Sequence, residues 1–383
     1  MEQIKFECEV VTPMFLGGAD QQAELRPPSI RGAMRWWFRA MMGGALAGTS
    51  SDLVKEVSRK EEAIFGSTNQ QSSFAISICP TAFESKPFKD LQGFFLTYLG
   101  YGLKDNNRKY IPNGSKFDVI LKFNSADSMV KRLTMATYWM LSNFGNLGAR
   151  ATRGFGSFAV RKGFVHNLPI VDSIEKLQEG LKTIIGKDFF DFPAIARAMT
   201  DPPFSIVHPS VWKCIVSTDP NLVFNNPISL MNTVGQKLRK FRENSGSTFT
   251  KVINGKTITG CHTKDYATIS SWSPPAAGAP STAIPSQTAF GLPHQFQGSG
   301  NLRIMVEGEN RPRRTSPLHI HVHKFGQSYN VSFQFFKSLF LDSGIKIQDM
   351  SKSTRHEIIA GVPSYSELDS FMSSFAPNRD IVL

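Results

Sequence analysis

Cysteine is scarce in this chain, and its spacing excludes two kinds of structure. The 383 residues contain Cys8, Cys79, Cys214 and Cys261, and no two of them form a CxxC pair. This spacing excludes a disulfide framework and a zinc knuckle. We therefore expect the four cysteines to act as small apolar residues in strands.

Long apolar runs are also missing. No uninterrupted apolar stretch is long enough to span a bilayer, and no lysine-rich amphipathic helix indicates binding to a membrane surface. The first ten residues, MEQIKFECEV, lack the basic start and apolar centre of a signal peptide. We expect a cytoplasmic protein with no membrane partner.

The sequence motifs of common enzymes are absent. The chain has no GxSxG, HExxH, Walker or paired-carboxylate motif. Histidine, the most frequent general base, first occurs at His166. We expect no catalytic residues, bound metal or cofactor, and this pattern favours a binding protein over an enzyme.

Positive charge, in contrast, is plentiful. The chain has 43 Lys and Arg residues against 31 Asp and Glu, a formal net charge of +12. A basic excess of this kind is typical of proteins that bind nucleic acids. With 41% hydrophobic residues, a chain of this length has enough apolar material for two cores. We expect two domains, residues 1–163 and 164–383.

The first of these ranges has a readable order of elements. Apolar residues alternate along 4–10, 74–78, 117–123 and 158–160, which predicts four strands. Helical periodicity over 29–42 and 129–144 predicts one helix after the first strand and one before the last. The resulting order, βαββαβ, is that of the α+β ferredoxin-like fold, which RNA-recognition motifs also use.

The second range is less regular. Its patterns predict helices at 174–184 and 227–241 and strands at 302–306, 318–323 and 329–335. Residues 270–285 are rich in Ser, Pro, Ala and Gly, which is typical of an exposed loop. We therefore expect a second α/β domain with additional elements. The pattern does not determine its topology.

The helix predicted at 29–42 carries a ridge of arginines. Arg31, Arg35 and Arg39 lie four residues apart, opposite an apolar face, so their guanidinium groups can follow successive phosphates. Trp36 lies beside the ridge and is a candidate to stack on a base. Pro27-Pro28 is expected to keep the chain extended and Ser29 to cap the helix. The alternative is a solvated arginine face with Trp36 packed inside the protein.

A second cationic element follows the helix at 129–144. Residues 145–156 contain four glycines around Arg150 and Arg153, so backbone N–H groups and guanidinium groups can together form an anion-binding nest. Phe155 is expected to offer a surface for stacking. The alternative is a flexible connection with incidental charge.

A third cationic cluster precedes the strand at 318–323. It consists of Arg311, Arg313 and Arg314, and the strand that follows alternates three histidines. Histidines at this spacing can bind zinc, but no acidic or cysteine partner lies in the segment. We expect His319, His321 and His323 to be polar surface residues. They would line a basic groove together with the arginines described above.

Three segments resemble a known family. Residues 12–18 (TPMFLGG) and 24–39 (ELRPPSIRGAMRWWFR) resemble the opening signature of the first subunit of Cmr complexes, a RAMP protein of type III-B CRISPR systems. Residues 147–156 resemble the glycine-rich loop of the RAMP superfamily, and residues 313–318 resemble a further motif of this subunit.

The resemblance implies two ferredoxin-like domains and a non-catalytic, RNA-binding subunit used in antiviral defence. Such a subunit lies near the 3′ end of the CRISPR RNA, helps to capture single-stranded target RNA, and has other RAMP subunits of the Cmr complex as neighbours. The RNA-binding candidates are the residues singled out above: Arg31, Arg35, Trp36, Arg39, Arg150, Arg153, Phe155, Arg311, Arg313 and Arg314.

Two other functions stay open at this point. In the first, the chain is a metal-independent RNA endonuclease like the RAMP enzymes that process CRISPR transcripts, with a histidine such as His319 or His321 as the base. Those relatives carry a catalytic histidine near the first helix, where this chain has arginine and tryptophan. Alternatively, the arginine and apolar surfaces are docking sites for neighbouring subunits.

Overall fold

The computed structural model describes most of the chain. The described residues are 2–18, 20, 22–80, 83–103, 108–193, 199–253, 256–265, 286–291, 294–295, 302–306, 315–339, 345–349, 355–356 and 364–383. The chain divides into two compact units. Unit 1 comprises residues 1–235, 318–338 and 375–383, and unit 2 comprises 236–317 and 339–374. The boundary that the sequence predicts between residues 163 and 164 stays a prediction.

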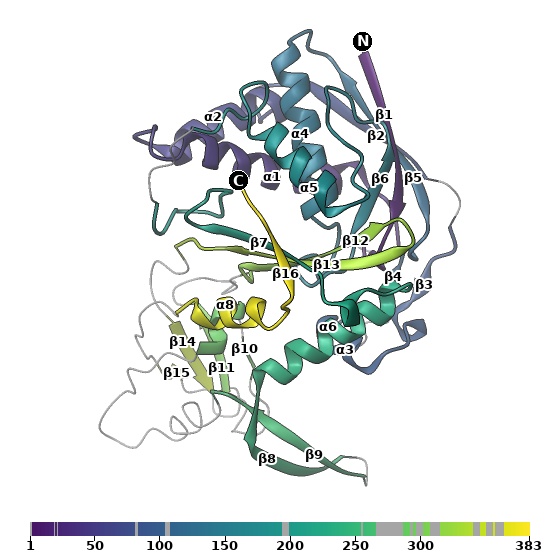
Figure 1. Cartoon of the computed structure of the whole chain (residues 1–383), viewed down its shortest axis with the longest axis vertical. Coiled ribbons are helices and arrows are strands. Elements are labelled where there is room, and N and C mark those ends of the chain that lie inside the picture. Colours follow the sequence, from purple (N-terminus) through teal and green to yellow (C-terminus); the bar gives the residue numbers. More distant parts are fainter. Residues whose placement is uncertain are drawn as a thin grey trace. The chain divides into compact units, whose positions relative to one another are not determined.

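The first sheet of unit 1 has the expected ferredoxin-like topology. It consists of β1 (Glu2–Val10), β2 (Phe74–Pro80), β5 (Lys116–Phe123) and β6 (Phe158–Lys162), in the antiparallel order β2-β5-β1-β6. Helices α1 (Pro27–Leu46) and α2 (Leu53–Phe65) follow β1, and α4 (Ser128–Phe144) precedes β6 (Figure 1). The predicted βαββαβ order is confirmed, with α2 as an addition.

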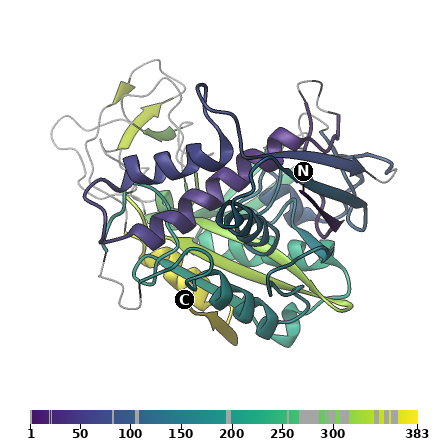
Figure 2. The same cartoon turned by 90° about the horizontal axis from the view of Figure 1, so that it is seen from above.

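Alternation along β1 places its apolar residues against the helices. Phe6 is fully buried, and the centre of its ring lies 4.6 Å from that of Tyr138 on α4. On α1, Phe38 packs 5.5 Å from Phe65 of α2, and the two helices lie side by side (Figure 2). Burial of these aromatic rings holds α4 on the sheet and α2 against α1.

The start of α1 differs from the expectation. The N-cap is Arg26, and the two prolines form the first helical turn instead of an extended segment. Proline suits this position because its fixed φ is helical and because the first N–H groups of a helix have no partner within it. Ser29 therefore lies inside the helix, where its N–H donates to the carbonyl of Arg26 at 3.1 Å.

The second sheet of unit 1 repeats the strand order of the first. It consists of β7 (Trp212–Ser217), β12 (Leu318–Phe325), β13 (Ser328–Phe336) and β16 (Asn378–Ile381), in the antiparallel order β12-β13-β7-β16. In chain order alone, α6 (Pro227–Arg242) follows β7, and α8 (Ser366–Ser373), which belongs to unit 2, precedes β16. This is again βαββαβ, the fold that the resemblance implied for the second half.

Short elements complete unit 1. They are β3 (Lys86–Pro87), η1 (Phe88–Asp90), α3 (Phe94–Leu99), β4 (Lys109–Tyr110), α5 (Ile174–Ile184) and η2 (Pro220–Leu222). The two sheets share one hydrophobic core, in which Phe144 of α4 lies 5.9 Å from Trp212 of β7. The two ferredoxin-like sheets of unit 1 are therefore packed together through buried aromatic side chains.

Unit 2 has its own small apolar centre. Its strands are β8 (Glu243–Ile253), β9 (Lys256–Thr263), β10 (His294–Gln295), β11 (Leu302–Val306), β14 (Ile345–Asp349) and β15 (Arg355–His356), with η3 (Ser286–Phe290) between β9 and β10. The rings of Phe241, Phe290 and Phe371 lie 5.3 to 6.2 Å apart. The loop predicted at 270–285 lies outside the described residues.

Two glycines offer a test of the packing in unit 1. Gly156 has a φ of +79°, and a Cβ there would lie 1.9 Å from the carbonyl oxygen of Leu147. We expect Gly156→Ala to lower the free energy of unfolding by at least about 2 kcal/mol, because it adds both backbone strain and a clash. Urea unfolding followed by circular dichroism measures the change.

The matched control is Gly32→Ala on α1. Gly32 is exposed, and a Cβ there meets no atom within 4 Å. Alanine is favoured over glycine within a helix, so this variant should gain about 0.5–1 kcal/mol. An equal effect of the two substitutions would contradict the described packing of the 145–156 loop.

Candidate nucleic-acid interface

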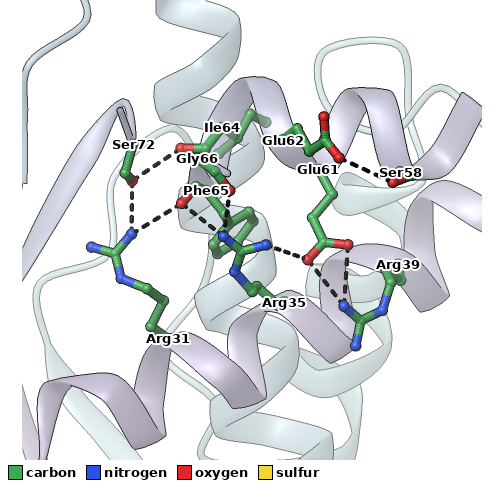
Figure 3. Close-up of polar contacts among 10 residues, drawn as sticks. All are labelled: Arg31, Arg35, Arg39, Ser58, Glu61, Glu62, Ile64, Phe65, Gly66 and Ser72. Carbon is green, nitrogen blue, oxygen red and sulfur yellow. Dashed lines mark hydrogen bonds and ion pairs between the residues drawn. The ribbon is translucent and has the colours of Figure 1, made fainter. Parts of the chain in front are cut away.

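Two arginines of the predicted ridge donate to the Phe65 carbonyl at the C-terminal end of α2, and Arg31 also binds residues that follow this helix. Arg31 donates to the Ser72 hydroxyl at 2.7 Å and to the Phe74 carbonyl at 3.0 Å. Arg35 donates to the carbonyl of Phe65 at 2.9 Å (Figure 3). The last carbonyls of a helix have no partner within it, so a cation is favourable there. These guanidinium groups hold α2 against α1.

A single buried carboxylate connects the ridge. Glu61 of α2 has a side chain that is 8% exposed, and it accepts hydrogen bonds from Arg35 at 2.8 Å and from Arg39 at 3.0 and 3.1 Å (Figure 3). One negative charge between two guanidinium groups leaves a net positive charge at the surface. The side chain of Arg39 is 41% exposed and that of Arg35 is 29% exposed. Arg39 is therefore the ridge arginine best placed to reach an outside anion.

Arg31 is half-buried, and its surroundings affect the ionisation of its guanidinium group. Burial, and secondarily the charge of Arg35, lower the pKa of Arg31 from its usual value. Arginine stays protonated even so. Its contacts with the ring of Phe74, 4.9 Å away, and with the Ser72 hydroxyl give it a structural role.

Trp36 is half-buried and packs within unit 1. The centre of its indole lies 4.9 Å from Trp37, 5.2 Å from His319 and 5.3 Å from Phe336. This is the packed alternative that the sequence left open. The indole joins α1 to β12 and β13, and stacking of this residue on a base stays a prediction.

The loop at 145–156 is a structural junction more than an open nest. The N–H groups of Leu147 and Ala149 donate to the carbonyls of Gly156 and Phe15, and that of Gly156 donates to Pro13. These N–H groups are therefore not available to an anion. Gly148, with a φ of +94°, allows the close approach because a Cβ there would lie 2.4 Å from the Phe15 carbonyl oxygen.

The expected role of Phe155 is wrong. The side chain is fully buried, and its ring centre lies 5.5 Å from that of Phe15 in an edge-to-face arrangement. A ring without exposed surface cannot stack on a base. The ring is buried because the loop folds back onto residues 13–15, which sequence spacing does not indicate.

The two arginines of this loop differ in setting. Arg150 is exposed, has a φ of +60°, and donates to the carbonyl of Tyr101. Arg153 is half-buried, and its backbone forms a parallel bridge with Ile320 of β12. The third predicted cluster, Arg311, Arg313 and Arg314, lies outside the described residues.

The amide of Asn146 links this loop to β12. Its Nδ2 donates to the carbonyls of Ala151 and Ile320, the latter at 2.8 Å. Its Oδ1 accepts from the Ser157 hydroxyl at 2.6 Å and from Nδ1 of His321 at 3.0 Å. A buried network in which every group has a partner is rigid, so the loop and the strand form one unit.

The histidines of β12 are interior residues, which corrects the expected polar surface. His321 and His323 are 1% and 4% exposed, and His319 is half-buried against Trp36. Nδ1 of His321 also donates to the Gly145 carbonyl at 2.8 Å, and Nε2 of His323 bonds the Ser332 hydroxyl at 2.9 Å. Sequence spacing found these residues, but it could not indicate that a second layer covers them.

The histidine pKa values follow from this burial. Burial lowers the pKa of His319 to about 4, with the charge of Arg153 as a further cause. Burial also lowers the pKa of His321 to about 4, although the Gly145 carbonyl opposes the change. These rings are therefore neutral at pH 7.

Two residues of the site were missed from the sequence. Glu61 lies on α2, a helix that the sequence analysis did not predict, although Asp52 and the apolar residues Val57, Ile64 and Phe65 were a readable signal. Asn146 gave no signal, because two of its partners, Ile320 and His321, lie on a strand about 175 residues away in the chain.

The described residues form neither a cluster of potential metal ligands nor a helix that could span a membrane. Within the described ranges, no group of three His, Cys, Asp or Glu side chains could hold a metal ion. In the same ranges, no helix has the length and apolarity needed to cross a bilayer. All four cysteines lie in strands, as expected, and all are free thiols.

Comparison with known proteins connects these features to one family. The RAMP superfamily profile matches residues 7–159. The CRISPR system Cmr subunit Cmr1-2 of Pyrococcus furiosus is 32% identical over 186 residues, which are 42% of this chain and 96% of that protein. Subunit Cmr1-1 of the same organism is 32% identical over 195 residues, 47% of this chain and 56% of that protein.

Solved structures share the fold along the whole chain. The apo form of Cmr1 from Pyrococcus furiosus superposes with a TM-score of 0.63 at 20% identity, covering 100% of this chain and 99% of that one. A chain of the type III-B Cmr-beta complex bound to cognate target RNA gives a TM-score of 0.52 at 11% identity, covering 97% and 98%. These similarities confirm the α+β class.

The buried histidines predict a loss of stability in acid. In the unfolded chain a histidine has a pKa near 6.5, whereas His321 in the folded protein has a pKa of about 4. Between these values the unfolded state binds protons that the folded state excludes, so the free energy of unfolding falls as the pH decreases from about 6.5 to about 4.

The variant His321→Asn keeps a donor for the Gly145 carbonyl and removes the titration. Near pH 5 it should reduce the slope of unfolding free energy against pH by about 1 kcal/mol per pH unit. Denaturant unfolding at several pH values measures the slope, and exposed His166→Asn is the control. The same slope in His321→Asn and wild type would contradict the burial of this ring.

Proposed function

Because this chain belongs to the Cmr1 family of RAMP proteins, we propose that it is a non-catalytic, RNA-binding subunit of a type III-B CRISPR effector complex. It lies near the 3′ end of the CRISPR RNA and helps to capture single-stranded target RNA for antiviral defence in the cytoplasm. Its partners are those two RNAs and the other RAMP subunits of the complex.

The observation that carries the proposal is the net positive, partly exposed ridge on α1. Glu61 compensates only one of the two guanidinium charges that contact it, and Arg39 keeps 41% of its side chain in solvent. Exposed Arg150 adds a second cation on the loop. Cations in this setting bind phosphates without reading a base sequence, so specificity comes from the guide RNA.

A non-catalytic role is supported by the histidines. A general base must come within hydrogen-bond reach of the proton that it removes. His321 is 1% exposed and its Nδ1 already donates to Gly145. The alternative of a metal-independent endoribonuclease with His321 as base therefore gains no support from this geometry, and His319 packs against Trp36.

Substitution of Arg39 tests the proposal. Arg39→Gln should weaken binding of single-stranded RNA and reduce the slope of log K against log salt by about 0.7, because one phosphate contact is lost. Arg59→Gln on α2 is the matched control, since its side chain is 68% exposed and it is likewise paired with a carboxylate, Glu56. Filter binding across a salt series measures both variants.

Glu61→Gln separates the RNA-binding role from a purely structural one. The substitution removes the internal anion that holds Arg35 and Arg39, so RNA affinity should rise even as the fold loses stability. Unchanged RNA affinity in folded Arg39→Gln and Glu61→Gln alike would assign the ridge to the fold alone.

A further inference from the structure

The strands β8 and β9 of unit 2 form a two-stranded ribbon. The pairing runs from Thr248↔Cys261 to Ile253↔Lys256, and β8 begins directly where α6 ends (Figure 1). Both strands carry exposed residues: Thr248, Thr250, Val252, Thr257 and Thr259. An isolated two-stranded ribbon is only marginally stable in water. A ribbon exposed in this way is suited to binding a partner.

The register separates the residues of the ribbon into two different faces. Successive residues of a strand point to opposite faces, so positions 247, 249, 251 and 253 share a face with 256, 258, 260 and 262. That face has two lysine positions, Lys251 and Lys256, and two isoleucine positions, 253 and 258, together with Phe249 and His262. The opposite face carries threonines, Val252 and Cys261, and no charged residue.

Phe249 forms a flat aromatic surface on the first of these faces. A Cβ at Gly260 would lie 2.8 Å from the Phe249 ring, so the ring lies directly on the glycine. The ring centre is 5.0 Å from that of His262, whose Nδ1 is hydrogen-bonded to the Ser247 hydroxyl at 2.9 Å. Phe249 nevertheless stays 36% exposed. One side of the ring covers Gly260, and exposed ring surface is left for a planar partner.

The charge of this region is strongly one-sided. Between residues 237 and 264 the only acidic residue is Glu243, against the cations Lys237, Arg239, Lys240, Arg242, Lys251, Lys256 and Lys264. Near the base of the ribbon, Arg239 pairs with Glu243 at 2.7 Å and Lys264 pairs with Glu367 at 3.2 Å. These ion pairs hold the base of the ribbon, and the segment as a whole is complementary to a polyanion.

We propose that the β8–β9 ribbon is a second contact with single-stranded RNA, in which a base stacks on Phe249 and Lys251 and Lys256 bind the adjoining phosphates. The proposal rests on the RNA-binding function proposed above and places a contact outside the residues predicted from the sequence. An aromatic surface flanked by cations is the common design for sequence-tolerant binding of single strands. The excess of cations over acidic residues between 237 and 264 favours an RNA strand over a protein partner.

Two variants test the two parts of the contact. Phe249→Leu keeps an apolar side chain over Gly260 and removes the aromatic surface, so the Kd for single-stranded RNA should rise at least about fivefold. Lys251→Gln with Lys256→Gln should reduce the slope of log K against log salt by about 1.4, or 0.7 for each phosphate contact. Fluorescence anisotropy of a labelled, unstructured RNA with the full chain measures both effects.

The controls are matched in chemistry. Phe94→Leu replaces a phenylalanine of unit 1 that is 72% exposed, and Lys187→Gln replaces an exposed lysine of unit 1. Both should bind RNA as the wild type does. Circular dichroism and thermal unfolding show whether each variant is folded before its binding is measured.

The outcomes distinguish this proposal from the broader function. Weaker binding by the ribbon variants but not by the controls supports it. If wild type and ribbon variants bind RNA equally well, the ribbon proposal is wrong and the RNA-binding function stands. If the ribbon variants bind RNA normally but fail to join the purified Cmr subunits, the ribbon is a protein-docking element. If the wild type binds no RNA, both proposals fall.

Discussion

The half-buried amide of Asn146 is the contact on which the architecture of unit 1 depends most. It lies just after α4, and its donors and acceptor reach the 151–157 loop and the backbone and histidine of β12 at once. In a low-dielectric interior an unsatisfied polar group costs free energy, so all of these partners must be in place together. The ion pair of Glu9 with Lys324 at 2.7 Å joins β1 to β12 of the second sheet, and the pair of Glu9 with Arg161 at 2.9 Å joins β1 to β6 within the first sheet.

The arginine- and glycine-rich motifs contribute to the fold as well as to the proposed RNA contact. Sequence spacing suggests phosphate contacts. In the structure, Arg31 donates to Ser72 and Phe74, and Arg35 donates to Glu61 and Phe65 of α2. The N–H groups of Ala149 and Gly156 donate to Phe15 and Pro13. The cations thus organise the first ferredoxin-like sheet while leaving a positive excess at its surface. The same residues can therefore serve the scaffold and the proposed interface, with Arg39 and Arg150 the more exposed members.

Local pattern predicted the first half of the fold well and the rest only in part. Alternation in β1 and β5 and helical periodicity in α4 gave the βαββαβ order, because each element buries one face of its own residues. The strand order of the second sheet could not be predicted from the sequence, because β7 pairs with β16, which lies more than 150 residues further along the chain. The partners of Arg35 and the burial of Phe155 depend on tertiary contacts that spacing does not encode.

The central claim is that this Cmr1-family chain binds single-stranded RNA without cleaving it. The most direct measurement is binding of the purified wild-type chain to labelled RNA across a salt series, with the same samples run on a denaturing gel. The account predicts affinity that falls as salt increases, together with intact RNA. Discrete cleavage products, or no binding at low salt, would contradict it.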